Sequence, residues 1–262
     1  MRLRLAPLLL LSLCCTGCFH MTTVLKVNGD GSGTIEHSML FTAAALAQLR
    51  QLTMLGGGNG QNMDPLSEQQ ARDMAGVIGQ GVTYVSSKPI ATAIGQGRES
   101  IYAFRDVNQL KISTQPPPPG GITVKTPGIS TEGETVTFGL TREPTGNAVL
   151  HIHVPEPNWF GAVGSANASG QMAIVKGLLA GAHILLAVEP GGALVRTSSP
   201  YAEGQRVTLL EVDLDEVLKD ETLLTRLGAA TTVEELKAIV RNAPGLKISL
   251  DRDITVEFTP AK

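Results

Sequence analysis

Apolar and polar residues alternate in several short runs of the chain, the pattern of half-buried β-strands. The first two runs, residues 22–29 and 34–41, flank the turn sequence Asp30-Gly31-Ser32-Gly33 and predict a β-hairpin. A second pair of strands is expected around Gly95-Gln96-Gly97, and further strands in TVTFGLT and AVLHIHV. The segment from ILLAVEP to EVDL predicts three more strands, and LKISLDRDITVEF predicts one closing strand.

Helical spacing of apolar residues marks a smaller set of segments. Thr42 is expected to cap a helix, AAALAQLRQLTML. Ser67 and Gln70 form a plausible capping box for a second helix that ends at Gly81. The residues expected on its buried face are Ala71, Met74, Val77 and Ile78.

Two regions near the C-terminus, DEVLKDETLLTRLG and TTVEELKAIVRNA, predict short helices, and Thr232 with Glu235 makes a capping box for the second. Strands come mostly in hairpins rather than alternating strictly with helices. The expected fold class is therefore α+β, a mostly antiparallel sheet built from hairpins with several packed helices.

The N-terminus carries the pattern of an export signal. Arg2 and Arg4 precede the apolar run 8–13, which is far shorter than the roughly 20 residues needed to cross a bilayer. Small residues then precede Cys18, as in the lipobox of bacterial lipoproteins, although Cys15 stands where Leu is usual. We therefore expect a signal peptide over 1–17, a lipidated tether over 18–21 and one α+β lipoprotein domain over 22–262.

Lipidation of Cys18 would fix the place of the protein. Two acyl chains suffice for stable membrane anchoring, and a bacterial lipoprotein carries three. Residue 19 is Phe rather than Asp, which by resemblance to the sorting rule of diderm bacteria favours the periplasmic face of the outer membrane. In an organism with a single membrane, the same anchor would hold the chain at the outer face of the cell membrane.

Composition narrows the class of function. The net charge of −3 offers no basic excess, so nucleic acid is not an expected partner. One Trp and three Tyr argue against an aromatic platform for carbohydrate. All three cysteines (Cys14, Cys15 and Cys18) lie in the N-terminal segment, so the domain is expected to fold without disulfides.

Two late segments carry a family resemblance. Residues 184–192 read ILLAVEPGG and residues 204–208 read GQRVT. This Pro-Gly turn with a following G-x-x-V-T strand, together with the DGSG turn, resembles the LppM-type lipoproteins of mycobacteria. The resemblance implies a soluble domain with helices and strands, tethered by a lipid, and a lipid- or glycolipid-binding role. It brings no catalytic residues.

Candidate sites for chemistry are few. His151 and His153 share one face of a strand with Ile152 on the other, but a metal site needs further ligands and only Glu156 is near. Asp30 begins a possible calcium loop, yet its twelfth position is Phe41, so a turn is the better interpretation. The acids Asp213, Asp215, Glu216, Asp220 and Glu221 suit helix starts. No cofactor or metal is expected.

The segment 171–182 is predicted as a helix of small and aliphatic residues, with Lys176 as its only charge. A helix that is apolar all round is either buried in a core or lines an apolar site. The residues expected to contact a ligand are Ile174, Val175, Leu178 and Leu179. Core packing and a partner surface are the alternatives.

These features favour a membrane-anchored, non-catalytic binding or assembly module for an amphiphilic ligand, a lipid or glycolipid, or for an envelope protein. The alternative is an envelope-modifying enzyme that uses His151 or His153 with acids near 211–221. A purely structural lipoprotein is a third interpretation that the sequence does not separate from the first.

Overall fold

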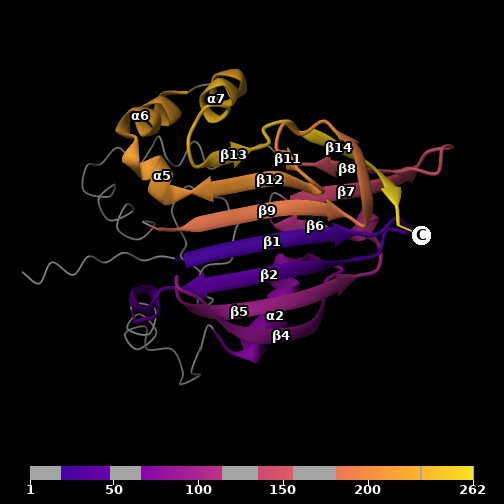
Figure 1. Ribbon diagram of the computed structural model, residues 1–262, viewed down its shortest axis with the longest axis horizontal. Helices are drawn as coiled ribbons and strands as arrows, with labels where there is room; N and C mark the ends of the chain where they lie inside the picture. Colours follow the sequence, from indigo (N-terminus) through magenta and orange to yellow (C-terminus); the bar gives the residue numbers. More distant parts are fainter. Residues whose placement is uncertain (1–18, 48–65, 114–134, 156–180, 231, 262) are drawn as a thin grey trace, which may run out of the picture.

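The computed structural model of the chain describes residues 19–47, 66–113, 135–155, 181–230 and 232–261, and it confirms an α+β fold with two largely antiparallel sheets (Figure 1). Sheet A contains, in spatial order, β11 (Ala202–Glu203), β12 (Arg206–Asp213), β9 (His183–Pro190), β1 (Phe19–Val27), β2 (Gly33–Phe41), β5 (Gln96–Phe104) and β4 (Thr83–Ala91), and β13 (Leu246–Ile248) pairs with β12. Sheet B contains β10 (Gly192–Thr197), β14 (Asp253–Pro260), β8 (Ala148–His153), β7 (Thr135–Arg142), β6 (Lys111–Ser113) and β3 (Gly79–Gln80).

The predicted hairpins are confirmed. Strands β1 and β2 pair antiparallel along their whole length. In the turn between them the Asp30 carboxylate accepts hydrogen bonds from the amide of Ser32 at 2.9 Å and from its hydroxyl at 2.7 Å. Gly31 takes the left-handed conformation there, with φ of +90°. Strands β4 and β5 form the second hairpin, and β7 and β8 a third.

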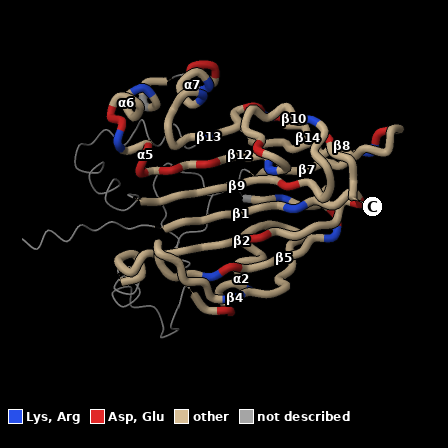
Figure 2. Tube along the Cα trace, in the orientation of Figure 1, with Lys and Arg blue, Asp and Glu red and all other residues tan. Residues whose placement is uncertain are grey.

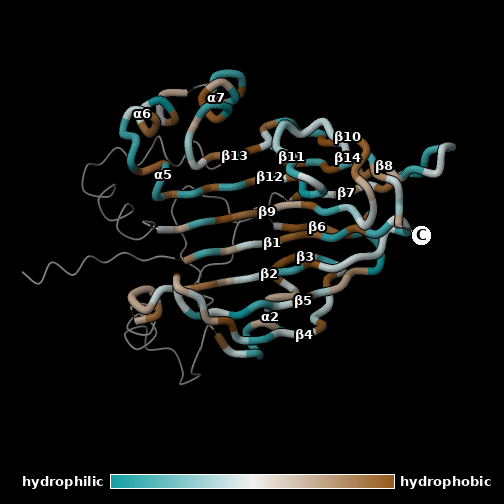
Figure 3. The backbone as a smooth tube through the Cα atoms, viewed as in Figure 1, coloured by the Kyte–Doolittle hydropathy of each residue, from teal (hydrophilic) through white to brown (hydrophobic). Residues whose placement is uncertain are grey.

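The main core lies between the two sheets. Alternate residues of the long strands turn apolar side chains inward, which gives the brown and teal alternation of Figure 3. Sheet A contributes, among others, Leu25, Val27, Ile35, Phe104 and Val188. Sheet B contributes, among others, Phe138, Leu150, Ile254, Val256 and Phe258. The face of sheet A that meets this core is called its inner face below.

Helices complete the fold at two places. Helix α2 (Glu68–Ile78) packs against β4, β5 and the short strands β3 and β6, and the buried hydroxyl of Tyr102 donates to the Ala71 carbonyl at 2.8 Å. Helices α5 (Leu214–Lys219), α6 (Glu221–Ala229) and α7 (Val233–Val240) form a second apolar cluster with β13 and the adjoining part of β12. A 3₁₀ turn, η1 (Val107–Gln109), precedes β6.

The expected helix starts are largely confirmed. The Ser67 hydroxyl accepts from the amide of Gln70 at 3.1 Å, and Thr232 forms the predicted capping box with Glu235. The predicted face of the second helix needs one correction. Ala71, Met74, Ala75 and Ile78 are buried, whereas Val77 is 47% exposed. That helix ends at Ile78 rather than at Gly81, because Gly79 already pairs with Ile112 as part of β3.

Three arrangements differ from the expectation. The closing segment forms two strands, since β13 pairs with β12 in sheet A and β14 pairs with β8 and β10 in sheet B. Strands β9 and β10 follow each other in sequence but lie in different sheets. Strand β9 pairs in parallel with β1, so the centre of sheet A is not antiparallel. Short-range alternation carries no information on which distant strand becomes the neighbour.

Some expectations fall outside the described residues. Residues 43–47 are helical and the Thr42 hydroxyl accepts from the Ala45 amide at 3.2 Å, but the rest of that predicted helix is not described. The same holds for Cys18 and for the apolar segment that contains Ile174, Val175, Leu178 and Leu179. No helix in the described part of the chain is long and apolar enough to span a membrane.

Candidate ligand-binding site

The inner face of sheet A continues beyond the sandwich core toward the first residue of β1. The strand register places these residues in three rows across β2, β1 and β9, and we call them the end rows. From the end of the sheet inward, the rows are Phe41 and Phe19, then Met39, Met21 and Ile184, then His37, Thr23 and Leu186. The next row, Ile35, Leu25 and Val188, already belongs to the core.

The end rows are mostly apolar and well covered. Phe41 is 2% exposed and Met21 8%, whereas Met39 and Leu186 are partly buried at the border of the core. Strands β12 and β5 flank the end rows on their two sides. On one side Leu210 and Val212 of β12 pack against the cluster of α5–α7. On the other side β5 pairs with β2, and its residues Arg98 and Ser100 lie opposite Met39 and His37.

Charged side chains are few in the three central strands at this end of the sheet. Among the residues of β1, β2 and β9, the Asp, Glu, Lys and Arg side chains are Lys26, Glu36 and Glu189. All three lie in the half of the strands away from residue 19, where Figure 2 shows them on neighbouring strands. The half near residue 19 therefore presents only uncharged side chains and histidines from these three strands.

One polar pair is buried within the end rows. The Thr23 hydroxyl and the His37 Nδ1 lie 3.0 Å apart on neighbouring strands. His37 is 5% exposed, and burial lowers the pKa of its imidazole to about 4, so the ring is neutral at physiological pH. Among the buried side-chain atoms of the described residues, His37 Nε2 has no hydrogen-bond partner. The imidazole thus offers one unused polar atom in apolar surroundings.

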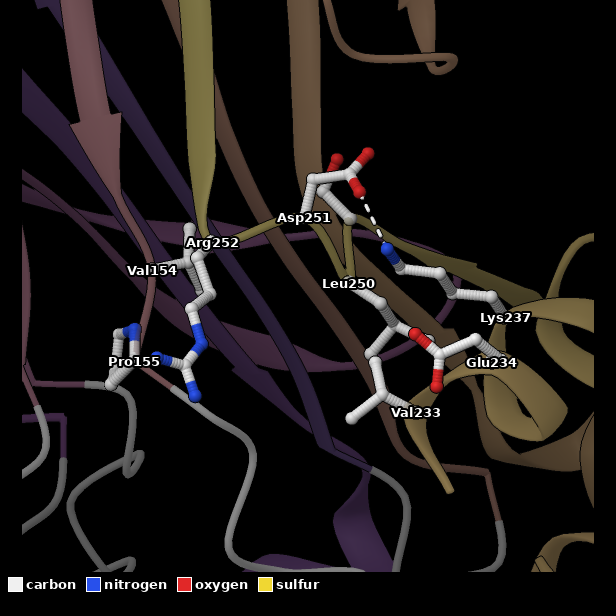
Figure 4. Close-up of a pocket in the computed structure, with 9 residues that line it drawn as sticks. Val154, Pro155, Val233, Glu234, Lys237, Leu250, Asp251 and Arg252 are labelled. Atoms are coloured by element: carbon white, nitrogen blue, oxygen red, sulfur yellow. Dashed lines mark hydrogen bonds and ion pairs between the residues drawn. The ribbon is translucent and has the colours of Figure 1, made fainter.

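A hollow of about 260 Å³ lies between helix α7 and the end of β8 (Figure 4). Its residues are Val154, Pro155, Val233, Glu234, Lys237, Ser249, Leu250, Asp251 and Arg252. The Lys237 ammonium and the Asp251 carboxylate form an ion pair at 2.7 Å on its edge. The main chain of Val154 donates to the Arg252 carbonyl at 2.8 Å, which joins the end of β8 to the link between β13 and β14.

The two strand histidines singled out from the sequence lie on the outer face of sheet B. Both imidazoles are exposed and Ile152 between them is buried, as the alternation predicts. His153 Nδ1 lies 2.9 Å from the Asp253 carboxylate, and His151 Nε2 lies 3.3 Å from the Thr141 hydroxyl. These two partners come from β14 and β7. The acids near 211–221 lie elsewhere, on β12 of sheet A and on the adjoining helices α5 and α6.

Two of the predicted acidic residues, Asp213 and Asp220, are helix caps, and Asp215, Glu216 and Glu221 lie in the first helical turns. The Asp213 carboxylate accepts from the amides of Asp215 and Glu216 at the start of α5. Asp220 caps α6 in the same way by accepting from the Leu223 amide at 2.9 Å. Both arrangements satisfy amide groups that a helix start leaves unpaired.

A network that the sequence did not predict joins the outer face of sheet A to β13. His183 Nε2 lies 3.3 Å from the Glu211 carboxylate, which also accepts from Lys247 at 3.0 Å. Burial opposes ionisation of Glu211, but the hydrogen bonds from Lys247 and His183 outweigh it and lower the pKa of the carboxyl group. The His20 and His183 rings are 5.5 Å apart, and burial together with His183 lowers the pKa of His20. Only the fold brings these positions together.

No protein-family model matches the chain, and no curated protein matches it. The NMR structure of the folded domain of the LppM protein from Mycobacterium tuberculosis is similar in arrangement. The alignment covers 94% of this chain and 96% of that one, with a TM-score of 0.31 and 11% sequence identity. A TM-score of this size carries no argument about the function of the chain.

The Thr23–His37 pair has the spacing of a nucleophile and its base, but an imidazole with a pKa of about 4 is a poor proton acceptor at neutral pH. No group of three or more His, Cys, Asp or Glu residues in the described ranges is placed to hold a metal ion. The end rows combine apolar side chains with one buried hydrogen-bonding atom, His37 Nε2, that has no partner among the described residues.

Proposed function

We propose that the chain is a lipid-tethered, non-catalytic binding module of the cell envelope that holds an amphiphilic molecule against the end rows of sheet A. The observation that carries the proposal is the position of Phe19. It is the first residue of β1 and the first residue of the end rows, and it directly follows Cys18 in sequence. Strand β1 thus begins three residues before the expected start of the domain at residue 22.

A lipid on Cys18 would leave almost no linker. One residue spans at most about 3.6 Å, so the end rows would stay next to the bilayer surface. The uncharged halves of β1, β2 and β9 would then be the part of the sheet nearest to the membrane. This arrangement gives an apolar molecule a short path between the bilayer and the inner face, and an envelope protein is the alternative occupant.

The anchor is tested with the full chain produced in a diderm bacterium. We expect labelled palmitate to be incorporated and the protein to fractionate with membranes. The variant Cys18→Ser would incorporate none, while Cys14→Ser would behave like the parent chain. Labelling of the Cys18→Ser variant would contradict the proposed anchor.

The ligand is tested by extracting the purified full chain with organic solvent and identifying co-purified molecules by mass spectrometry. A stoichiometric amphiphile, reduced in Ile184→Asn, is the expected result. The matched control is Val195→Asn, since Val195 is 51% exposed on β10, away from the end rows. Both variants are first compared by thermal unfolding. A chain free of any amphiphile would exclude this function and direct attention to a protein partner.

A further inference from the structure

His37 lies in the innermost of the end rows, between polar and apolar neighbours. Thr23 faces it from β1 and Ser100 faces it from β5. Along its own strand the next residues on the same face are Ile35, in the core, and Met39, at the border of the core. The imidazole therefore marks the boundary between the sandwich core and the apolar end of the sheet.

The neighbours of His37 have partners of their own. Ser100 interacts with the hydroxyl of Tyr102, which donates to the Ala71 carbonyl of α2. The Thr23 hydroxyl is hydrogen-bonded to the Nδ1 atom of the ring. His37 is only 5% exposed. Its Nε2 atom nevertheless has no hydrogen-bond partner among the described residues. Native proteins pair the great majority of such atoms, so an unpaired one is a candidate contact for a ligand or a buried water.

The tautomer of the ring restricts the chemistry of that molecule. If the Thr23 hydroxyl donates to Nδ1, then Nε2 carries the proton and needs an acceptor. If Nδ1 donates to Thr23, then Nε2 is an acceptor and needs a donor. A hydroxyl group satisfies both cases because it donates and accepts. A carboxylate or an ammonium group would bring an unpaired charge into apolar surroundings beside a neutral ring, which is costly.

We propose that His37 Nε2 is the polar contact of the bound amphiphile, and that it hydrogen-bonds a neutral hydroxyl group while the alkyl chain lies along the partly exposed side chains of Met39, Ile184 and Leu186. The inference rests on the proposed function and specifies its ligand: a long-chain molecule with an alcohol group. Arg98 lies in the row of Met39, and its guanidinium donates to the Leu66 carbonyl and the Ser87 hydroxyl. A ligand with an anionic head would instead turn to Arg98.

The test uses three probes of equal chain length with the full chain in phosphatidylcholine vesicles: 1-hexadecanol, hexadecane and palmitate. Retention of deuterated probe is measured against vesicles without protein, and ¹⁵N-labelled imidazole signals report the contact atom. We expect hexadecanol to bind roughly three- to tenfold more tightly than hexadecane, because one neutral hydrogen bond changes an affinity by about this factor. It should shift the His37 Nε2 signal and leave those of His151 and His153 unchanged.

Two variants make the result decisive. His37→Phe should bring the hexadecanol-to-hexadecane ratio close to one, whereas His37→Gln keeps a polar atom and should keep part of the preference. His151→Phe, on the exposed face of sheet B, is the matched control and should leave the ratio unchanged. Thermal unfolding establishes that each variant is folded before binding is compared.

Each other outcome is informative. If none of the three probes binds to the parent chain, the proposed function fails as a whole. If hexadecanol and hexadecane bind equally and His37→Phe changes nothing, the module binds apolar chains but the role of His37 is wrong. If palmitate binds more tightly than hexadecanol, the ligand head is anionic and the hydroxyl inference is overturned. An Nε2 signal that no probe shifts indicates a buried water, which also overturns it.

Discussion

The burial of His37 makes a prediction about stability and pH. In the folded protein the imidazole has a pKa of about 4, while in the unfolded chain it titrates near the ordinary value of 6.5. Between these values the unfolded state binds a proton that the folded state does not, so stability falls as the pH falls. The contribution is fully retained above pH 6.5 and lost as the pH approaches 4. From pH 7.5 to 4.5 the linkage relation gives a loss of about 2.5 kcal/mol.

The assay is urea unfolding of the parent chain and of His37→Phe at pH 7.5, 6.0 and 4.5. Each protein is compared with itself across pH, so the change in packing caused by the substitution cancels. The parent chain should lose about 2.5 kcal/mol more than the variant over this range. The lowered pKa of His20 is common to both proteins and cannot produce the difference. Parallel pH profiles of the two proteins would refute the reasoning, because they would mean that His37 titrates normally when folded.

Three further predictions concern other parts of the fold. Tyr102→Phe removes the buried hydrogen bond to α2 and should lower the free energy of unfolding by about 1–2 kcal/mol in urea titrations; an unchanged midpoint would show that this bond does not hold α2. Phe258→Ala empties a site with no exposed surface and should cost about 3–5 kcal/mol, against less than about 0.5 kcal/mol for the exposed control Val195→Ala; similar losses would contradict the shared core. His153→Gln weakens an exposed contact with Asp253, so it should change the free energy of unfolding by less than about 1 kcal/mol and leave amphiphile binding intact. Lost binding would show that the ligand also contacts sheet B.

Local features of the fold were predictable from the sequence because they depend on neighbouring residues. The turn at Asp30 and Gly31 follows from a carboxylate that bonds two residues ahead and a glycine that tolerates positive φ. The capping box of Thr232 and Glu235 is equally local. The outward orientation of His151 and His153 needed only the period-two alternation of a strand.

The candidate site was not predictable because it depends on pairing between distant strands. Thr23 and His37 are 14 residues apart, and the alternation of β2 puts His37 on the apolar face of Ile35 and Met39. No sequence pattern, however, shows that its Nε2 atom lacks a partner. Leu186 joins them only because β9 pairs in parallel with β1, across about 160 residues. The residues predicted to contact a ligand, Ile174 to Leu179, lie outside the described ranges, so that expectation stays a prediction.

The parallel pairing of β1 and β9 also sets an order of events when the chain folds. Strands β1 and β2 form one hairpin, β4 and β5 form another, and β2 pairs with β5, so these four strands can assemble before the later residues appear. The other edge of β1 then stays open until residues 183–190 arrive. An exposed edge of this length is a template for pairing with another molecule. A chain that appears N-terminus first therefore passes through a stage in which its central strand is vulnerable to misassembly, and cellular factors that delay folding until β9 is present would raise the yield of native protein.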